Sequence, residues 1–387
     1  RNKIFSYEEI KNIKNIKFSE NKELLNDIDV FIITVPTPID AENNPDLSFV
    51  RNASKLVGEA IKLNINNRCN QIIIYESTFY PGVTEEICVP ILESNSGKIF
   101  NDEQLDSTFY CGYSPERINP GDKEHNLNSV IKVTSGCNAR VASWVDEFYG
   151  SFIKAGTFKT SSIKVAEAAK IIENTQRDIN IALVNELSML FKKVDIDTQE
   201  VLSAASTKWN FHKYKPGLVG GHCIGVDPYY LTYMARKISF NTRLISAGRV
   251  INDYMYQHLS QLILKEIEKQ KEDSGNINIL ILGLSYKSNC SDVRNSQLIK
   301  LIKSIKIKNI KFTIVDPQID QEQVFNDTGL KSYKSIPKNQ KFRIIIFALY
   351  HEEFKNLSKQ VLNKYSYKNT IIFDLNNKII GSNVIHF

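Results

Sequence analysis

One cysteine-bearing segment gathers the residues of this chain that are best suited to chemistry. Lys215–Tyr229 has the sequence KPGLVGGHCIGVDPY, in which four glycines and two prolines surround Cys223. Glycine and proline are unfavourable inside helices and central strands, so this composition predicts a loop that approaches a ligand closely and presents the thiol. Asp227 and Pro228 are typical of a helix start, with Asp227 as the N-cap. A cysteine just before a helix N-terminus is favoured as a reactive thiolate, whereas the structural alternative is a buried, inert thiol.

A second group of polar residues follows helical spacing. Lys170, Asn174 and Arg177 are separated by four and three positions in a segment that predicts a helix, so they would share one face. A lysine and an asparagine one turn apart can both donate to a developing oxyanion. An arginine one turn further suits a phosphate or a sugar. The alternative interpretation is a solvated polar face.

Further polar groups follow segments that predict strands. Glu76–Thr78 and Ser114–Glu116 each stand at a strand end, where a carboxylate can act as a general base and a hydroxyl can hold a water or a cofactor amide. Turn residues that bond their own backbone would have the same composition. Gly283–Arg294 also follows a strand; its single glycine makes a weak nucleotide motif, although Lys287 and Arg294 suit an anionic ligand.

The elements that must position these residues alternate between strand and helix. The pattern predicts strands at Ile28–Pro36, Gln71–Tyr75 and Phe109–Gly112, with helices at Leu47–Leu63 and from Thr84. A second set of strands is predicted at Ile277–Leu284, Lys311–Val315, Phe342–Phe347 and Thr370–Phe373. We therefore expect an α/β fold with two Rossmann-like, doubly wound domains, whose ligands bind at the carboxyl ends of the strands.

Helical segments separate the two sets of strands. Lys164–Lys193 contains neither Gly nor Pro, so it predicts one helix of roughly 45 Å that could bridge two domains or form a dimer seam. Further helices are expected at 196–206 and 245–269, and the polar stretch Lys271–Asn276 predicts a linker. We expect three domains, at 1–160, 161–270 and 271–387, with the middle one helical.

Composition argues against several classes of protein. The 387 residues carry a net charge of +6 with basic residues spread along the chain, so we expect no nucleic-acid partner. No apolar run approaches the ~20 residues of a membrane-spanning helix, and we expect no membrane partner. Six widely spaced cysteines without a CxxC pair indicate a reducing compartment, so the expected location is the cytoplasm. The six histidines lack metal-ligand spacing, and no metal is expected.

Several motifs together resemble one enzyme family over nearly the whole chain. They are Val35–Pro38 (VPTP), Tyr75–Gly82 (YESTFYPG), Ser114–Gly121 (SPERINPG), Glu167–Lys170 (EAAK) with Asn174, Gly220–Pro228 (GGHCIGVDP), Gly248–Arg249 and Gly283–Arg294. In this order they resemble the UDP-glucose/GDP-mannose dehydrogenase family. Ser114–Gly121 and Ser206–Phe211 look most like the branch that acts on UDP-N-acetylhexosamines such as UDP-GlcNAc and UDP-GalNAc.

The resemblance implies an NAD-dependent, four-electron oxidation of a sugar C6 hydroxyl to a carboxylate, for surface polysaccharide biosynthesis. Cys223 would attack the intermediate aldehyde and carry a thioester that water then hydrolyses. The C6 oxygen would be handled by Lys170, Asn174 and Asp227. Glu116 would be the base for hydrolysis, and Thr78 would hold water near the nicotinamide.

The resemblance also implies binding residues and an assembly. NAD would be contacted by Thr37, Thr78 and Arg294. The UDP-sugar would be held by Arg177, Lys215, Gly220, Tyr286 and Lys287, with Arg249 reaching across the interface of a homodimer or a dimer of dimers. The three expected domains then become NAD-binding (1–160), central helical, for dimerisation and catalysis (161–270), and UDP-binding (271–387).

Two departures from the family pattern bear on these expectations. No GxGxxG turn with a following acidic residue precedes Ile28, so we expect the first βαβ unit to be missing: either the chain is a fragment or it lacks the usual NAD binding. The UDP-glucose branch has an acidic residue four positions after the equivalent of Glu116, where this chain has Pro120, which disfavours UDP-glucose. The alternatives are a UDP-glucose, UDP-ManNAc or GDP-mannose 6-dehydrogenase, and a non-catalytic UDP-sugar-binding scaffold.

Overall fold

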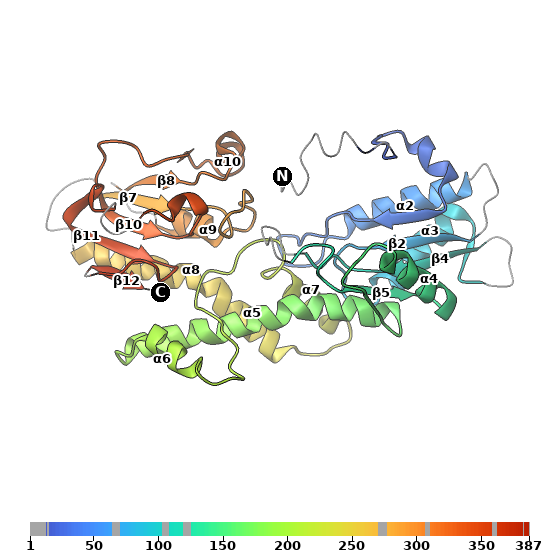
Figure 1. Cartoon of the computed structure of the whole chain (residues 1–387), viewed down its shortest axis with the longest axis horizontal. Coiled ribbons are helices and arrows are strands. Elements are labelled where there is room, and N and C mark those ends of the chain that lie inside the picture. The colour runs from blue at the N-terminus through green and yellow to red at the C-terminus, as the bar shows by residue number, and fades with distance from the viewer. Residues whose placement is uncertain are drawn as a thin grey trace. The chain divides into compact units, whose positions relative to one another are not determined.

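The computed structural model describes residues 13, 15–63, 70–102, 108–118, 125–269, 277–305, 310–357, 362–381 and 383–386. They form two compact units (Figure 1). The amino-terminal unit contains the described residues up to Thr175 together with Val226–Thr242, and the carboxy-terminal unit contains Gln176–Gly225 and Arg243–Phe387. The long helix α5 (Ile163–Lys193) contributes residues to both units, and it confirms the helix predicted at Lys164–Lys193.

The amino-terminal unit is built on one sheet with the strand order β1-β2-β4-β5-β6, and β3 pairs with β4. The strands are β1 (Val30–Ile33), β2 (Gln71–Tyr75), β3 (Ile99–Phe100), β4 (Thr108–Tyr113), β5 (Lys132–Gly136) and β6 (Thr157–Lys159). The helices wholly in this unit are η1 (Lys22–Asp27), α2 (Ser48–Lys62), the π-helical turn η2 (Thr84–Cys88), α3 (Val89–Ser96), α4 (Ala139–Gly150) and α7 (Asp227–Lys237). The three strands predicted for this half are confirmed as β1, β2 and β4.

Both faces of the amino-terminal sheet are covered, as in a doubly wound fold. One core contains Ile73 and Tyr75 of β2 together with residues of α2 and α3. The other contains Ile74 of β2 packed with Val145 and other residues of α4. The side chains of β2 alternate between these cores because successive residues of a strand point to opposite faces.

β5 is the exception to the parallel pairing of this sheet. It runs antiparallel to β4, with Gly112 opposite Gly136 and Tyr113 opposite Ser135. A Cβ on Gly136 would lie 2.3 Å from the backbone nitrogen of Ala142, so only glycine lets the first turn of α4 approach the end of β5 this closely. The sequence pattern does not predict β5 because it is short and three of its five residues are polar.

The carboxy-terminal unit contains a parallel sheet with the strand order β12-β11-β10-β7-β8-β9. Its strands are β7 (Ile277–Leu282), β8 (Ile310–Val315), β9 (Ser332–Tyr333), β10 (Phe342–Phe347), β11 (Ser366–Asp374) and β12 (Val384–His386). The helices wholly in this unit are α6 (Thr198–Ala205), α8 (Arg243–Lys269), α9 (Gln297–Ser304), α10 (Gln321–Thr328) and η3 (Glu352–Phe354). Ile279 of β7 packs with α8 and α9, whereas the neighbouring Leu280 packs with η3 on the opposite face.

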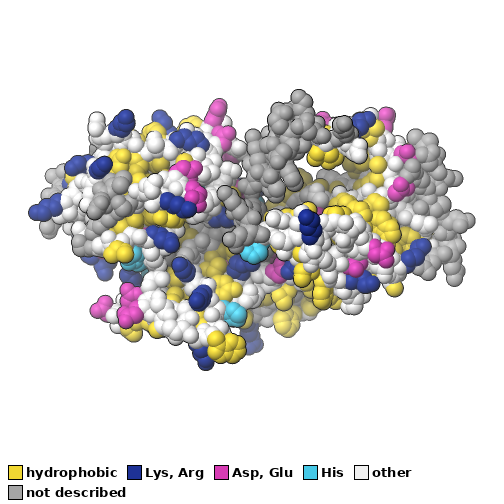
Figure 2. Space-filling model, in the orientation of Figure 1, with side chains coloured by type: hydrophobic (Ala, Val, Ile, Leu, Met, Phe, Trp, Pro, Cys, Tyr) yellow, Lys and Arg dark blue, Asp and Glu magenta, His cyan; other side chains and the backbone are white. Residues whose placement is uncertain are grey.

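The two sheets confirm the predicted fold class, an α/β protein with two Rossmann-like halves. On the face seen in Figure 2, basic and acidic side chains are interspersed rather than gathered into patches of one sign. Within the described part of the chain, no helix combines the length and the apolarity that crossing a membrane requires. The expected linker Lys271–Asn276 and the substrate-related Pro120 lie outside the described residues, and the three-domain division stays a prediction.

Candidate active site

The cysteine loop of the carboxy-terminal unit is anchored at both ends of its glycine-rich part. At one end, Gly217 donates its N–H to Oδ1 of Asn185 at 2.8 Å and accepts a bond from Nδ2 of the same side chain at 3.0 Å. At the other end, Gly221 has φ +86°, and a Cβ there would lie 2.6 Å from the ring of Tyr286. Asn295 donates to the carbonyl of Gly221 at 3.2 Å. The loop thus approaches other protein residues closely, and its predicted approach to a ligand stays a prediction.

The segment that receives this loop is itself held by a buried, hydrogen-bonded aspartate and histidine. Oδ2 of Asp316 accepts hydrogen bonds from the backbone N–H groups of Leu284 (2.8 Å) and Ser285 (3.0 Å). Nε2 of the fully buried His351 lies 3.3 Å from the same oxygen. Because Nδ1 of His351 accepts from the N–H of Asn289 at 2.9 Å, Nε2 carries the proton and faces Asp316. This arrangement fixes the turn that carries Tyr286 and Lys287.

Cys223 lies beside a histidine that sequence reasoning did not select. Nδ1 of His222 is 3.2 Å from Sγ of Cys223, and Nε2 of His222 is 3.4 Å from Oδ2 of Asp292. Arg294 donates to Asp292 through Nε at 3.0 Å and through Nη2 at 2.5 Å. The pKa of His222 is raised to about 9, mainly by the hydrogen bond to Asp292 and secondly by the hydrogen bond to Cys223. Burial raises the pKa of Asp292, but the bonds from His222 and Arg294 outweigh it and hold this pKa well below its ordinary value.

The remaining sugar-binding candidates of this unit differ in exposure. Arg249 is 4% exposed and pairs with Asp178 at 2.7 Å and Asp253 at 2.5 Å, so within one chain it is a buried ion-pair residue. Nζ of Lys287 lies 5.6 Å from the ring centroid of Tyr286. Lys215 and Arg177 are exposed. Contact of any of these residues with a substrate or a second subunit stays a prediction.

In the amino-terminal unit, α5 and α7 bring together three of the predicted catalytic residues. Lys170 and Asn174 are buried on α5, and Nδ2 of Asn174 donates to Oδ2 of Asp227 at 2.6 Å. Asp227 is the first residue of α7, whose N-cap is Val226. The prediction of Asp227 as N-cap is therefore wrong: its side chain points to Asn174, and Pro228 stands in the first turn as expected.

A charged cluster lies at the carboxyl ends of β2 and β4, next to the predicted base Glu116. Nζ of Lys132 is 3.1 Å from Oε1 of Glu76 and 3.2 Å from the carbonyl oxygen of Pro115. The hydroxyl of Tyr149 donates to the same Glu76 oxygen. Burial lowers the pKa of Lys132, and the carboxylate of Glu76 counters part of this effect. Glu116 is exposed, and its carboxylate accepts a bond from the N–H of Ile118.

A buried carboxylate ties α5 to the turn that follows β2. Oε2 of Glu167 accepts from the N–H of Gly82 at 2.6 Å, and Oε1 accepts from both the N–H (2.9 Å) and the hydroxyl (2.7 Å) of Thr84. Burial raises the pKa of Glu167 to about 7, and the three hydrogen bonds counter part of that rise. Lys170 lies one turn further along the same helix, so this contact positions it relative to the strand ends.

The strand ends of the amino-terminal unit have features that fit a dinucleotide. The hydroxyl of Ser77 donates to the carbonyl of Val35 at 2.6 Å, and that of Tyr230 donates to the carbonyl of Thr37 at 2.7 Å. These bonds fix the loops after β1 and β2, whose threonines, Thr37 and Thr78, are half-buried. Hydroxyl and amide groups at the carboxyl ends of parallel strands are where such sheets bind dinucleotides.

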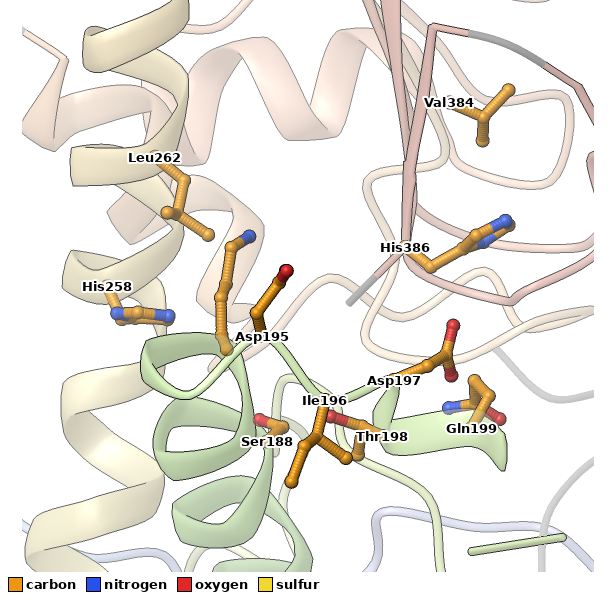
Figure 3. A pocket seen from close by; sticks show the side chains of 11 residues that line it. Ser188, Asp195, Ile196, Asp197, Thr198, Gln199, His258, Leu262, Val384 and His386 are labelled. Atoms are coloured by element: carbon orange, nitrogen blue, oxygen red, sulfur yellow. The ribbon is translucent and has the colours of Figure 1, made fainter. Parts of the chain in front are cut away.

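A pocket elsewhere in the carboxy-terminal unit contains none of the predicted site residues (Figure 3). It lies at the end of α5 and the start of α6, where it is also lined by α8 and β12, and has a volume of about 380 Å³. His258, Asp197 and His386 are among its lining residues. Among the described residues, no group of three His, Cys, Asp or Glu side chains could hold a metal ion.

The predicted site residues are divided between the two units. The amino-terminal unit contains Lys170, Asn174, Asp227, Glu116, Thr78 and Thr37, among which Asn174 and Asp227 are in contact; the carboxy-terminal unit contains Cys223, Gly220, Tyr286, Lys287, Arg294, Arg249, Arg177 and Lys215. Sequence reasoning missed His222, Asp292 and Lys132. The position of His222 directly beside Cys223 was the one signal available, because Asp292 and Lys132 lie far from their partners in the sequence.

Two Rossmann-like sheets with polar groups at their strand ends are typical of nucleotide-binding proteins. Three domains of the UDP-glucose/GDP-mannose dehydrogenase family match the chain: the NAD binding domain at residues 6–153, the central domain at 164–254 and the UDP binding domain at 280–380. The chain belongs to this family, and it is an NAD-dependent nucleotide-sugar dehydrogenase.

Two curated relatives and one solved structure illustrate the similarity. UDP-N-acetyl-D-glucosamine 6-dehydrogenase of Pseudomonas aeruginosa is 45% identical over 367 residues, which cover 95% of this chain and 84% of the relative. The enzyme of the same name from Salmonella typhi is 45% identical over 95% of this chain and 84% of its own length. The structure of UDP-D-ManNAc dehydrogenase from Pyrococcus horikoshii has a TM-score of 0.80 at 30% identity, and covers 95% of this chain and 83% of its own.

Proposed function

We propose that this chain oxidises the C6 hydroxyl of a UDP-N-acetylhexosamine to a carboxylate, with UDP-N-acetyl-D-glucosamine as the substrate. The names of the two relatives that are 45% identical support this choice. The solved relative, at 30% identity, is titled for UDP-D-ManNAc, which makes UDP-ManNAc the first alternative. UDP-glucose and GDP-mannose are more distant alternatives.

The first oxidation converts the alcohol to an aldehyde, and we assign the C6 oxygen to Lys170, Asn174 and Asp227. Their burial supports this role, because donors and acceptors held in a low-dielectric site stabilise developing charge strongly. NAD, when bound, accepts the hydride that leaves C6, and Thr37, Thr78 and Arg294 would hold it. Thr78 would also hold a water near the nicotinamide.

The second oxidation needs a nucleophile, and we assign this role to Cys223. Its thiolate adds to the aldehyde carbon, so that a C–S bond forms and the carbonyl electron pair moves to oxygen; loss of a second hydride, for which a second NAD would be the acceptor, then leaves a thioester. Glu116 would take a proton from the water that breaks the C–S bond and releases the carboxylate. The observation that carries the proposal is the half-buried thiol in a loop held at both Gly217 and Gly221.

The UDP moiety and the sugar need binding groups, which we assign to the carboxy-terminal unit. The proposed contacts are Arg177, Lys215, Gly220, Arg249, Tyr286 and Lys287. The exposed cationic groups of Lys215 and Arg177 suit a diphosphate. The buried ion pairs of Arg249 make it the least accessible member of this set in a single chain.

The experiment that tests this function counts NADH formed per nucleotide sugar. The wild-type protein should form two NADH per UDP-N-acetylglucosamine, and Cys223→Ser should lose the second oxidation. Cys137→Ser is the matched control, because Cys137 is the other half-buried thiol among the described residues. Equal stoichiometry in wild type and Cys223→Ser would remove Cys223 as nucleophile. UDP-sugar binding without turnover would support the scaffold alternative. A faster reaction with UDP-ManNAc than with UDP-N-acetylglucosamine would identify UDP-ManNAc as the substrate instead.

We also propose an assembly and a location. On α5, Val165, Ile172, Leu183 and Leu190 follow one another at spacings of seven, eleven and seven residues, which return to nearly the same side of a helix. Each is between 46% and 54% exposed. This apolar stripe on α5 supports a homodimer, or a dimer of dimers. We further propose a cytoplasmic location, a role in surface polysaccharide biosynthesis, and three domains divided at 160/161 and 270/271.

A further inference from the structure

The side chains around Cys223 form a continuous chain of polar contacts. Sγ of Cys223 lies 3.2 Å from Nδ1 of His222, whose Nε2 lies 3.4 Å from Asp292. Asp292 in turn accepts two bonds from Nε and one from Nη2 of Arg294. All four residues belong to the carboxy-terminal unit. With Cys223 and Asp292 as anions and His222 and Arg294 as cations, each charge stands next to an opposite one.

The position of Asp292 decides which nitrogen of His222 can accept a proton. A carboxylate accepts hydrogen bonds and cannot donate them, so the ring nitrogen that faces Asp292 carries a hydrogen. Nε2 is therefore protonated in the neutral ring, and its Nδ1 lone pair faces the thiol. Arg294 keeps Asp292 ionised and in place, which maintains this tautomer.

The surroundings of His222 favour its protonated form. Besides Asp292 and Cys223, the ring of His222 faces Tyr286, whose ring centroid is 5.5 Å away. The hydroxyl of Tyr286 carries no charge near neutral pH. The guanidinium of Arg294 pairs with Asp292, the same carboxylate that faces Nε2 of His222. The raised pKa of His222, about 9, agrees with this arrangement.

We propose that His222, oriented by Asp292, takes the proton of the Cys223 thiol and holds the resulting thiolate as an ion pair. The S–H bond of Cys223 breaks, its electron pair stays on sulfur, and the proton forms a bond to Nδ1 of His222. The inference rests on the proposed role of Cys223 as nucleophile and adds the group that activates it. His222 is a positioning and activating residue, because it acts on the substrate through the sulfur.

The ion pair also serves the end of the reaction. When water attacks the thioester, the electron pair of the C–S bond returns to sulfur, and the imidazolium stabilises the departing thiolate. A helix N-terminus was the expected source of thiolate stabilisation, but the described contact of the sulfur is with His222.

The test measures how fast iodoacetamide alkylates Cys223 between pH 5 and pH 9, with the modified peptide identified by mass. A free thiol is only a few per cent thiolate at pH 7. We therefore expect wild type to react at pH 6.5 at least tenfold faster than His222→Gln, whose profile should follow that of an ordinary thiol. Asp292→Asn should also shift the pH profile of Cys223 alkylation towards that of an ordinary thiol. His258→Gln, a change of a half-buried histidine in the pocket of Figure 3, should leave it unchanged.

The outcomes separate this inference from the proposed function. A wild-type alkylation midpoint near the ordinary thiol value of about 8.5 would overturn the ion pair, and that measurement requires no variant. Equal profiles in wild type and His222→Gln would overturn it as well. The NADH stoichiometry of Cys223→Ser tests the nucleophile independently, since it does not depend on how the thiolate is formed.

Discussion

At the scale of single residues, Gly221 has the most restricted position in the cysteine loop. Its φ of +86° lies in the region that favours glycine, and any Cβ would meet the ring of Tyr286 at 2.6 Å. Gly217, four residues earlier in the same loop, has open space where its Cβ would be. The two glycines therefore differ in what they tolerate, although they look alike in the sequence.

We expect Gly221→Ala to lower kcat at least tenfold and to destabilise the protein by roughly 1–2 kcal/mol or more, the cost of a left-handed conformation for an L-residue. The thiol of Cys223 would move with the displaced loop. Steady-state NADH formation and thermal unfolding measure the two effects. Gly217→Ala is the control and should change both little, because the bonds of Gly217 to Asn185 involve only its backbone. Equal losses in the two variants would contradict this account.

Single residues were also where sequence reasoning was least complete. The choice of Cys223, Lys170 and Asn174 needed only residue type and spacing. The prediction of Asp227 as N-cap was wrong, because Asp227 is the first residue of α7 and its carboxylate accepts a bond from Asn174, fifty-three positions earlier in the chain. His222 was considered only as a metal ligand, and its partner Asp292 comes from a different segment. Contacts between distant segments leave no periodic signal in a sequence.

At the scale of elements, Glu167 connects α5 to the start of the helical turn after β2. Its pKa is raised from 4.5 to about 7 in the folded protein. Between these values the folded state binds more protons than the unfolded state, so the contribution of Glu167 to stability is lost as the pH rises from about 4.5 to 7. Glu167 therefore contributes most to the stability of the folded state near and below pH 4.5.

We expect Glu167→Gln to flatten this part of the pH dependence of the unfolding temperature. Glutamine does not titrate, and its amide nitrogen cannot accept the hydrogen bonds that both carboxylate oxygens accept from Gly82 and Thr84. Thermal unfolding at half-unit steps from pH 4.5 to 8 measures the difference. Glu86→Gln, an exposed glutamate of the adjoining turn that pairs with Lys164, should keep the wild-type slope. The idea fails if both variants give the same curve.

Elements were predicted better than residues. Runs of β-branched residues identified β2 and β10 at their observed bounds, and the absence of Gly and Pro identified α5 to within one residue. β5 was not predicted, because Lys132–Gly136 is short, and its burial depends on packing against α4 rather than on its own composition. Periodic apolar residues therefore report on long, regular elements, and they do not report on short strands placed by their neighbours.

At the scale of the whole molecule, the apolar stripe on α5 requires a partner if it is to leave water. We expect Leu183→Glu combined with Leu190→Glu to convert the protein to a monomer, because two charges would then have to be buried in the interface. Light scattering coupled to size-exclusion chromatography measures the mass. Phe325→Glu changes a similarly exposed apolar residue on α10 and should not alter the assembly. A monomeric wild-type protein would refute the proposed dimer.

The unbroken helix α5 also has a consequence for how this chain can change during evolution. Glu167, Lys170, Asn174, Asp178 and Asn185 all lie on this one helix of 31 residues. Inserting one residue near position 181 would rotate every later side chain by about 100° and advance it by about 1.5 Å relative to the earlier ones. Asp178 and Asn185 both contact Asn252 within the carboxy-terminal unit, and after such an insertion they could no longer reach it together. Substitutions along this helix can be accepted one at a time, whereas a change in its length between Asp178 and Asn185 would break several contacts at once.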